Sequence, residues 1–143
     1  MESHTPNKSI TISTDKRKLN VAIIYENLSN SYWAKDRSED QIITSIEKST
    51  CFGVYDGDMQ IGFARVITDY STFAYLTDVF IIKSHQGLNL SKWLVDMIMN
   101  YHELLDVPTW MLLTNDAQGL YEQFGFIVFP FPERIMVMKR DVG

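Results

Sequence analysis

The sequence is poor in residues that stabilise a fold covalently or anchor it in a membrane. Among its 143 residues there is one cysteine, Cys51. A lone cysteine cannot form an intrachain disulfide, which fits a reducing compartment. No apolar run is long enough to span a bilayer, and no N-terminal stretch resembles a secretion signal. We therefore expect a cytoplasmic protein with no membrane partner.

Positive charge and metal-ligand patterns are also scarce. Lysine and arginine number 13 against 18 acidic residues, giving a net charge of −5. No basic stripe is present, so nucleic-acid binding is disfavoured, because recognition of phosphates depends on clustered cations. Cys51 and the histidines His4, His85 and His102 lack the spacing of metal ligands, so we expect no metal site. Neither a nucleophile elbow nor a Walker loop occurs.

The chain does contain enough apolar and aromatic residues for one core. It is 45% hydrophobic and 13% aromatic, which is typical of a globular protein of this length. Residues 1–20 are polar and without sustained periodicity, and they predict a flexible arm in which Ile10 and Ile12 could form an edge strand. Residues 21–143 are predicted to form a single domain.

The clearest pattern lies between residues 72 and 101. Residues 73–82 are rich in aromatic and β-branched types, which predicts a strand. An apolar stripe then begins at Leu90 and recurs every three or four residues as far as Leu105, which predicts a helix. The short polar connection, followed by the exposed N–H groups of a helix start, is typical of an anion site.

The other predicted elements surround this unit. Ser38 and Gln41 predict a capping box at the start of a helix, and Asp56-Gly57-Asp58 predicts a hairpin turn. A third, short helix is predicted over residues 116–124, capped by Asp116 and ended by Gly125. Further strands are predicted over residues 21–25, 51–55, 60–68, 109–114, 126–129 and 135–138.

These elements predict an α/β (α+β) protein with a mixed, twisted, largely antiparallel sheet flanked by helices. At its centre the strand at residues 73–82, the following helix and the strand at residues 109–114 form a parallel, right-handed strand–helix–strand unit.

Residues 78–94 resemble motif A of the GNAT superfamily of acetyl-CoA-dependent N-acetyltransferases. That motif reads Arg/Gln-x-x-Gly-x-Gly/Ala from the end of the fourth strand into the next helix. Gln86 matches its first position, whereas Asn89 and Ser91 stand where the family usually has Gly and Gly/Ala. Residues 114–126 resemble motif B and keep its Tyr-Glu-x-x-Gly-Phe core. The two motifs in this order and at this separation indicate the GNAT fold and superfamily.

The resemblance implies an acetyl-CoA site built largely from backbone groups. The pyrophosphate would bind the turn and helix start formed by Gln86, Gly87, Leu88, Asn89, Leu90, Ser91 and Lys92. The pantetheine arm and the thioester oxygen would lie along the strand residues Val79, Phe80 and Ile81. Asn115 would bind the cofactor arm or, alternatively, cap a helix.

The resemblance also assigns the proton transfers and the acceptor side. Tyr121 matches the family's general acid, although it could instead be a packed helix tyrosine. Asp78 is a candidate base beside the thioester, with Glu26, Asp36 or a water chain as alternatives. By strand alternation the side chains of Asp78 and Thr77 would lie on opposite faces.

Tyr32 and Trp33 are candidates for the wall of the acceptor site, or else for core or edge packing. We therefore expect direct transfer of an acetyl group from acetyl-CoA to a primary amine of a small molecule or peptide, in a ternary complex. The alternative is a non-catalytic GNAT-like module that binds acyl-CoA or regulates a partner, suggested by Asn89 and Ser91. Homodimerisation through the C-terminal strands is common in the family and is expected here on that ground alone.

Overall fold

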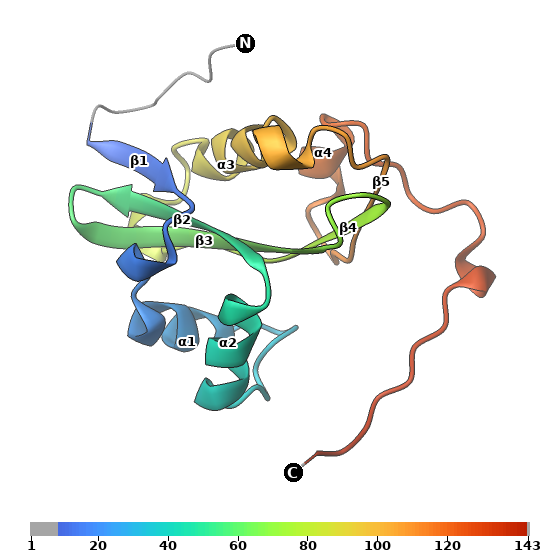
Figure 1. The fold of residues 1–143 in the computed structure, drawn as a ribbon, viewed down its shortest axis with the longest axis horizontal. Helices are drawn as coiled ribbons and strands as arrows, with labels where there is room; N and C mark the ends of the chain where they lie inside the picture. The colour runs from blue at the N-terminus through green and yellow to red at the C-terminus, as the bar shows by residue number, and fades with distance from the viewer. Residues whose placement is uncertain (1–8, 143) are drawn as a thin grey trace. The chain divides into compact units, whose positions relative to one another are not determined.

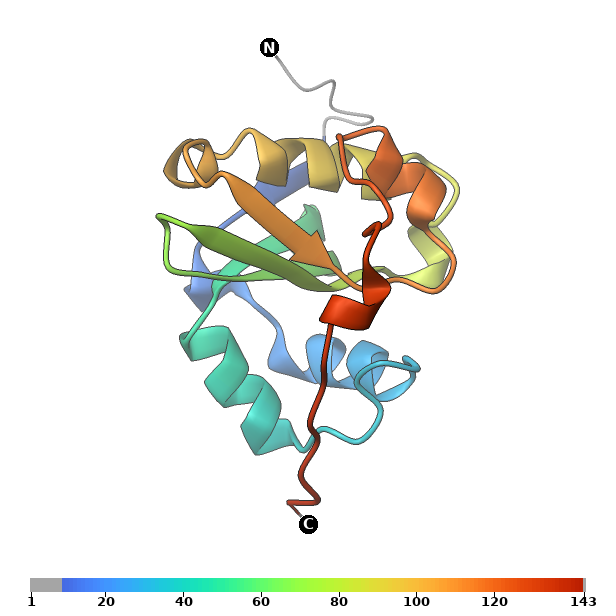
Figure 2. The ribbon, with the colours of Figure 1, turned by 90° about the vertical axis from the view of Figure 1, so that its right-hand side faces the viewer.

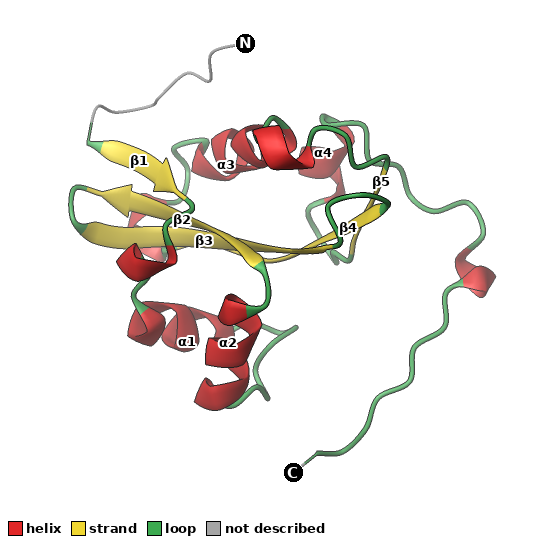
Figure 3. Ribbon diagram, in the orientation of Figure 1, coloured by secondary structure: helices red, strands yellow, loops and turns green. Residues whose placement is uncertain are grey.

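The structure, a computed structural model, describes residues 9–142 (Figure 1). These residues form two compact units, one ending at Leu113 and the other beginning at Thr114. The first unit holds a five-stranded sheet in the order β1-β2-β3-β4-β5. Its strands are β1 (Ile10–Ser13), β2 (Thr50–Asp56), β3 (Met59–Thr68), β4 (Phe73–Ile81) and β5 (Thr109–Leu112) (Figure 3).

Strand directions in this sheet confirm the predicted fold class. The neighbours β1 to β4 pair antiparallel, whereas β4 and β5 pair parallel. The turn between β2 and β3 contains Gly57 at a φ of +59°, the left-handed conformation for which glycine was predicted there. The helix between β4 and β5 is α3 (Leu90–Met99), which supplies the crossover that a parallel pair requires.

Helices cover both faces of the sheet. Helices α1 (Val21–Ser29) and α2 (Glu39–Glu47) lie on one face, and α3 lies on the other (Figures 1 and 2). Ile24 and Leu28 of α1 pack with Ile42 and Ile46 of α2 and with Phe63 of β3 in one buried cluster. Both faces of the sheet are therefore buried, so the runs in β2 and β3 are almost continuously apolar.

Helix α2 begins as the sequence predicts, with a capping box. The Ser38 hydroxyl accepts from the Gln41 N–H at 3.1 Å, and the Gln41 side chain accepts from the Ser38 N–H at 2.8 Å. Helix α3 ends at Met99, earlier than the stripe suggested, and a short 3-10 helix (His102–Leu104) follows. Leu104 is buried in this 3-10 helix, so the apolar pattern extends beyond the C-terminal end of α3.

The prediction of a strand at residues 21–25 is wrong, because these residues form the beginning of α1. The Asn20 side chain caps this helix by accepting from the Ile23 N–H at 3.2 Å, and Ile24 and Leu28 form its buried side. A short apolar run fits a strand or a helix equally well, and the cap decides between them. The first strand is instead β1, as Ile10 and Ile12 suggested, paired with β2.

Part of the predicted flexible arm is therefore regular structure. Residues 10–13 belong to the sheet and residues 16–18 form a 3-10 helix. Residues 1–8 of that arm lie outside the described residues. No helix within residues 9–142 is long and apolar enough to cross a membrane.

The second unit contains α4 (Gln118–Glu122) and a 3-10 helix (Pro132–Arg134). Gly125 ends the α4 region at a φ of +93°, and the Phe126 N–H donates to the Tyr121 carbonyl at 3.3 Å. This is the glycine-terminated helix end that was predicted.

Two predictions for this unit are wrong. Asp116 does not cap α4, because the N-cap position is Ala117, whose N–H donates to the Thr114 hydroxyl at 3.0 Å. Residues 126–129 and 135–138 contain no strand within the described chain. A strand exists only where a second strand pairs with it, and the apolar pattern alone does not supply one.

Candidate functional site

A β-bulge interrupts β4 at its centre. Phe63 of β3 faces Phe80 of β4, whereas Arg65 faces Thr77, so two steps along β3 oppose three along β4. Asp78 lies at this irregularity with a φ of +57°. Such a conformation costs a non-glycine residue about 1–2 kcal/mol and persists only where surrounding contacts hold it. A bulge also redirects a side chain, and here that side chain belongs to Asp78.

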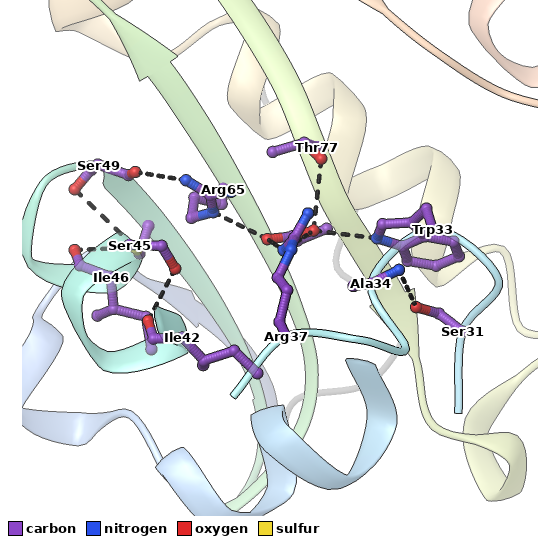
Figure 4. Close-up of polar contacts among 12 residues, drawn as sticks. Ser31, Trp33, Ala34, Arg37, Ile42, Ser45, Ile46, Ser49, Arg65 and Thr77 are labelled. Atoms are coloured by element: carbon purple, nitrogen blue, oxygen red, sulfur yellow. Dashed lines mark hydrogen bonds and ion pairs between the residues drawn. The ribbon is translucent and has the colours of Figure 1, made fainter. Parts of the chain in front are cut away.

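The Asp78 carboxylate is held by four side chains from three parts of the first unit. Arg65 donates from Nε to Oδ2 at 2.8 Å, and Arg37 donates from Nη1 to both oxygens at 2.8 and 2.7 Å. The indole N–H of Trp33 donates to Oδ1 at 3.0 Å, and the Thr77 hydroxyl lies 3.4 Å from it. Figure 4 shows these side chains converging on one point. The predicted alternation is therefore wrong at the bulge, because Thr77 and Asp78 meet on the same side.

The ion pairs decide the charge of this group. Burial alone would raise the pKa of Asp78, but attraction to Arg65 and Arg37, together with their hydrogen bonds, outweighs it and holds the pKa below its ordinary value. Asp78 is therefore an ionised carboxylate whose two oxygens are already engaged. This weakens the case for Asp78 as the base.

The segment between α1 and α2 brings two aromatic side chains to the same place. Its backbone is folded by the Ser31 hydroxyl, which accepts from the Ala34 N–H at 3.1 Å. Tyr32 and Trp33 meet edge to face with ring centres 5.1 Å apart. They are 54% and 40% exposed, so neither is a core residue. Exposure excludes core packing for both, and their place in the wall of the acceptor site stays a prediction.

Strand β5 ends before β4 does, beside this cluster. Their pairing runs from Phe73 and Thr109 to Leu76 and Leu112 and then stops, while β4 continues to Ile81. Over its last part β4 pairs only with β3 in the described chain. The backbone of residues 79–81 therefore has one edge without a strand partner, as an extended ligand lying along β4 requires.

The turn after β4 leads into α3 through two left-handed residues. Gly87 has a φ of +84° and Asn89 a φ of +59°. The turn is tied to the strand by the Gln86 side chain, which donates to the Ile81 carbonyl at 2.9 Å. Asn89 thus adopts a left-handed conformation, which glycine adopts freely and which asparagine tolerates better than most other residues.

The start of α3 fits an anionic group. Asn89 stands at the N-cap but its side chain makes no capping hydrogen bond. No atom lies within 4 Å of a Cβ built on Gly87. Asn89 therefore does not cap the first amides of α3, and the turn at Gly87 is open, as the binding of a phosphate requires.

Tyr121 and Asn115 belong to the second unit, whereas the other predicted site residues belong to the first. Tyr121 is buried, and its ring packs edge to face with Phe126, with ring centres 5.9 Å apart. That Tyr121 and Asn115 meet the turn and β4 in one site stays a prediction.

Sequence reasoning missed Arg37 and Arg65, the two partners of Asp78. The signal was available, because a carboxylate within an apolar strand is costly to bury without a cationic partner. Arg65 lies within the equally apolar β3 and was the natural candidate. Arg37 is 41 residues away from Asp78, in a loop that no periodicity marks.

Comparison with known proteins identifies the family. A model described as an acetyltransferase (GNAT) domain matches residues 47–128. A Gibberella zeae protein assigned as an acetyltransferase is 33% identical, over 77% of this chain and 74% of that protein. The crystal structure of a GNAT-family protein from Xanthomonas campestris pv. campestris, also assigned as an acetyltransferase, is 39% identical with a TM-score of 0.87, covering 92% of this chain and 93% of that one. The chain therefore belongs to the GNAT acetyltransferase family.

More distant structures share the fold alone. An acetyltransferase from Clostridium acetobutylicum, solved with acetyl-CoA, is 10% identical with a TM-score of 0.67, covering 91% of this chain and 96% of that one.

Proposed function

We propose that the protein transfers an acetyl group from acetyl-CoA to a primary amine of a small molecule or peptide, both being bound at once. The observation that carries this proposal is that β4 continues past Leu76, where its pairing with β5 ends at Leu112, and leads to the left-handed turn at Gly87 and Asn89. Membership of the family and the acetyl-CoA named with the Clostridium acetobutylicum structure support the choice of donor.

Backbone groups would hold most of the donor. The amides at the turn and at the start of α3 would bind the pyrophosphate, aided by the helix dipole. These amides belong to Gly87, Leu88, Asn89, Leu90, Ser91 and Lys92, since that of Gln86 donates to the Lys83 carbonyl at 3.3 Å. The free edge of β4 would bind the pantetheine arm and the thioester oxygen through Val79, Phe80 and Ile81. Asn115 would contact the same arm.

The chain supplies orientation, polarisation and one proton. Acetyl-CoA, when bound, supplies an acetyl group activated as a thioester. Backbone N–H groups of β4 directed at the carbonyl oxygen are worth roughly 3–4 kcal/mol each as negative charge develops on it. As the amine nitrogen bonds to the carbonyl carbon and the carbon–sulfur bond breaks, the Tyr121 hydroxyl gives its proton to the departing sulfur. The amine loses one proton to water, and solvent returns one to Tyr121.

We assign Asp78 to positioning rather than to proton abstraction. Its lowered pKa and its bonds to Arg37 and Arg65 make it a weak base. Glu26 and Asp36 are exposed carboxylates on α1 and on the loop that follows. A water chain, with or without one of them, would carry the proton away.

The test of the function is the Tyr121→Phe variant. Loss of the proton donor should lower kcat at least about tenfold and leave the affinity for acetyl-CoA nearly unchanged, because the hydroxyl acts in the transition state. The matched control is Tyr101→Phe, which removes a hydroxyl lying 3.4 Å from Glu103, outside the proposed machinery. Equal kcat values for the two variants would refute the role of Tyr121.

A non-catalytic acyl-CoA-binding or regulatory module is the alternative, suggested by Asn89 and Ser91 at the two glycine positions. Thermal unfolding with acetyl-CoA, CoA and ATP separates the readings, because a ligand that binds only the folded chain raises the Tm with its concentration. Stabilisation by both CoA species, without turnover of any amine, would favour the module. No response to any of the three would exclude both.

A further inference from the structure

The cluster around Asp78 carries more positive than negative charge. The Asp78 carboxylate forms ion pairs with two guanidinium groups, those of Arg37 at 2.7 Å and Arg65 at 2.8 Å. Trp33 and Thr77, its other partners, are neutral, as is Ser49, which accepts from Nη1 of Arg65 at 2.9 Å. The cluster therefore has one positive charge without a counter-charge among these residues, beside the strand that is proposed to hold the thioester.

The two arginines differ in their access to a ligand. The side chain of Arg65 is 8% exposed and lies within the sheet, whereas that of Arg37 is 28% exposed. Arg37 uses Nη1 alone for both Asp78 oxygens. Within residues 9–142 its Nε and Nη2 atoms make no hydrogen bond. These two atoms form the side-on edge with which a guanidinium binds a planar anion through two parallel bonds.

This edge is held in place before any ligand arrives. The bonds to Asp78 fix the guanidinium, and the Trp33 indole, anchored to the same carboxylate at 3.0 Å, stands next to it. Tyr32 extends the aromatic surface. The neighbouring acid in the loop, Asp36, is exposed and forms no ion pair with Arg37 in the described chain. An oriented arginine fork beside half-exposed rings is the arrangement that recognises a small organic acid.

We propose that the acceptor amine carries a carboxylate, which pairs with the Nε and Nη2 edge of Arg37, so that the acceptor class is that of amino acids and related amino carboxylates. This inference rests on the proposed function. Asp78 precedes residues 79–81 of β4, and a strand advances about 3.3 Å per residue. Asp78, whose carboxylate holds Arg37, therefore lies within about 10 Å of the strand positions proposed for the thioester, so the anion site adjoins that part of β4.

The test compares amines that differ only in this charge. Glycine is paired with glycinamide and phenylalanine with phenylalaninamide, with acetyl-CoA at saturation and the full chain as enzyme. We expect kcat/KM for the acid to exceed that for its amide at least about tenfold in the pair that fits the pocket. The amide has the less basic amine and therefore more free amine at neutral pH, so reactivity alone would give the opposite order.

The Arg37→Gln variant should bring that ratio close to one, mainly by raising the KM of the acid. Arg37→Lys, which keeps the charge but loses the fork, should give an intermediate ratio. Arg17→Gln is the matched control, because the Arg17 side chain is 91% exposed and its ion-pair partner within residues 9–142 is Asp15. This variant should keep the ratio of the natural protein. Phosphoethanolamine, tested in parallel, distinguishes a phosphate from a carboxylate.

The outcomes separate this inference from the proposed function. Acetylation of acid and amide with equal kcat/KM, or a preference for phosphoethanolamine over both, overturns the carboxylate assignment and leaves acetyl transfer intact. Calorimetry with N-acetylglycine and N-acetylphenylalanine, and with their amides, needs no turnover. Binding of the acid forms that Arg37→Gln abolishes supports the anion site even if no amine is acetylated, in which case the proposed function alone fails. Equal binding of acids and amides refutes the site.

Discussion

Replacing Asp78 with asparagine isolates the charge at the centre of the site. The two side chains have nearly the same shape, and both residue types tolerate the left-handed φ of +57° seen there. The substitution therefore adds no backbone strain at the bulge and removes the counter-charge of Arg65 and Arg37. It also directs an amide N–H₂ toward a guanidinium that can only donate.

The expected loss of stability depends on the two arginines that remain without their counter-charge. Removing one partner of a buried ion pair typically costs about 3–5 kcal/mol, because the other charge remains buried without compensation. Arg65, with its side chain 8% exposed, cannot turn to solvent, whereas Arg37, at 28%, can do so in part. We therefore expect the lower end of that range, about 3 kcal/mol, and a fall in Tm of about 10 °C.

Urea unfolding of the natural protein and the variant measures this loss. With a slope of about 2 kcal/mol per molar urea, the midpoint should fall by about 1.5 M. Asp58→Asn, the same exchange at an exposed position in the β2–β3 turn, is the matched control and should leave the midpoint unchanged. A midpoint for Asp78→Asn equal to that of the control would refute the conclusion that the two ion pairs stabilise the bulge.

The lowered pKa of Asp78 also predicts how the stability lost in Asp78→Asn should change with pH. The pKa of Asp78 is lowered in the folded protein, so its contribution is fully present above the unfolded pKa of about 4. It is lost as the pH falls through the folded value. The difference in stability between the natural protein and Asp78→Asn should therefore be constant from about pH 5 to 8 and shrink below about pH 4. A difference that grows toward acid pH would contradict the assignment.

Two further predictions concern Cys51 and Asn89. Burial raises the pKa of the Cys51 thiol to about 11. Ellman's reagent at pH 8 should therefore leave the native protein unmodified and react with one thiol per chain in guanidinium chloride. Fast reaction of the native protein would contradict this. Asn89 adopts a φ of +59°, so Asn89→Val should lower the free energy of unfolding by about 1–2 kcal/mol. Asn89→Gly should preserve stability and tighten acetyl-CoA binding; equal unfolding midpoints for the Val and Gly variants would show that the turn carries no such constraint.

Local patterns predicted the elements whose causes lie within a few residues. The capping box of Ser38 and Gln41 and the glycine turns at Gly57 and Gly125 depend on contacts across at most five positions. The apolar stripe of α3 likewise needs only its own periodicity. The same local reasoning failed at residues 21–25. This apolar run is short enough to fit the periodicity of a strand or of a helix, and the residue that caps the helix, Asn20, lies just before the run.

The candidate site was foreseen in part. The turn from Gln86 to Ser91 and the strand before it could be located from the motif, because backbone geometry is encoded next to the residues that adopt it. The role of Asp78 could not be located in this way. Strict alternation would have pointed its side chain away from Thr77, and one extra residue in β4 reverses that direction.

The sequence by itself determined the family, the order of most elements and the left-handed turn that enters α3, since each is encoded in neighbouring residues. Only the tertiary structure decided that Asp78 would be neutralised by Arg65 and Arg37, which lie 13 and 41 residues away along the chain. It also decided that Arg37 uses Nη1 alone for Asp78, so that Nε and Nη2 make no hydrogen bond within residues 9–142. The reason is that a buried charge finds its partner by the packing of whole elements, and no local propensity records which distant residue will be brought to it.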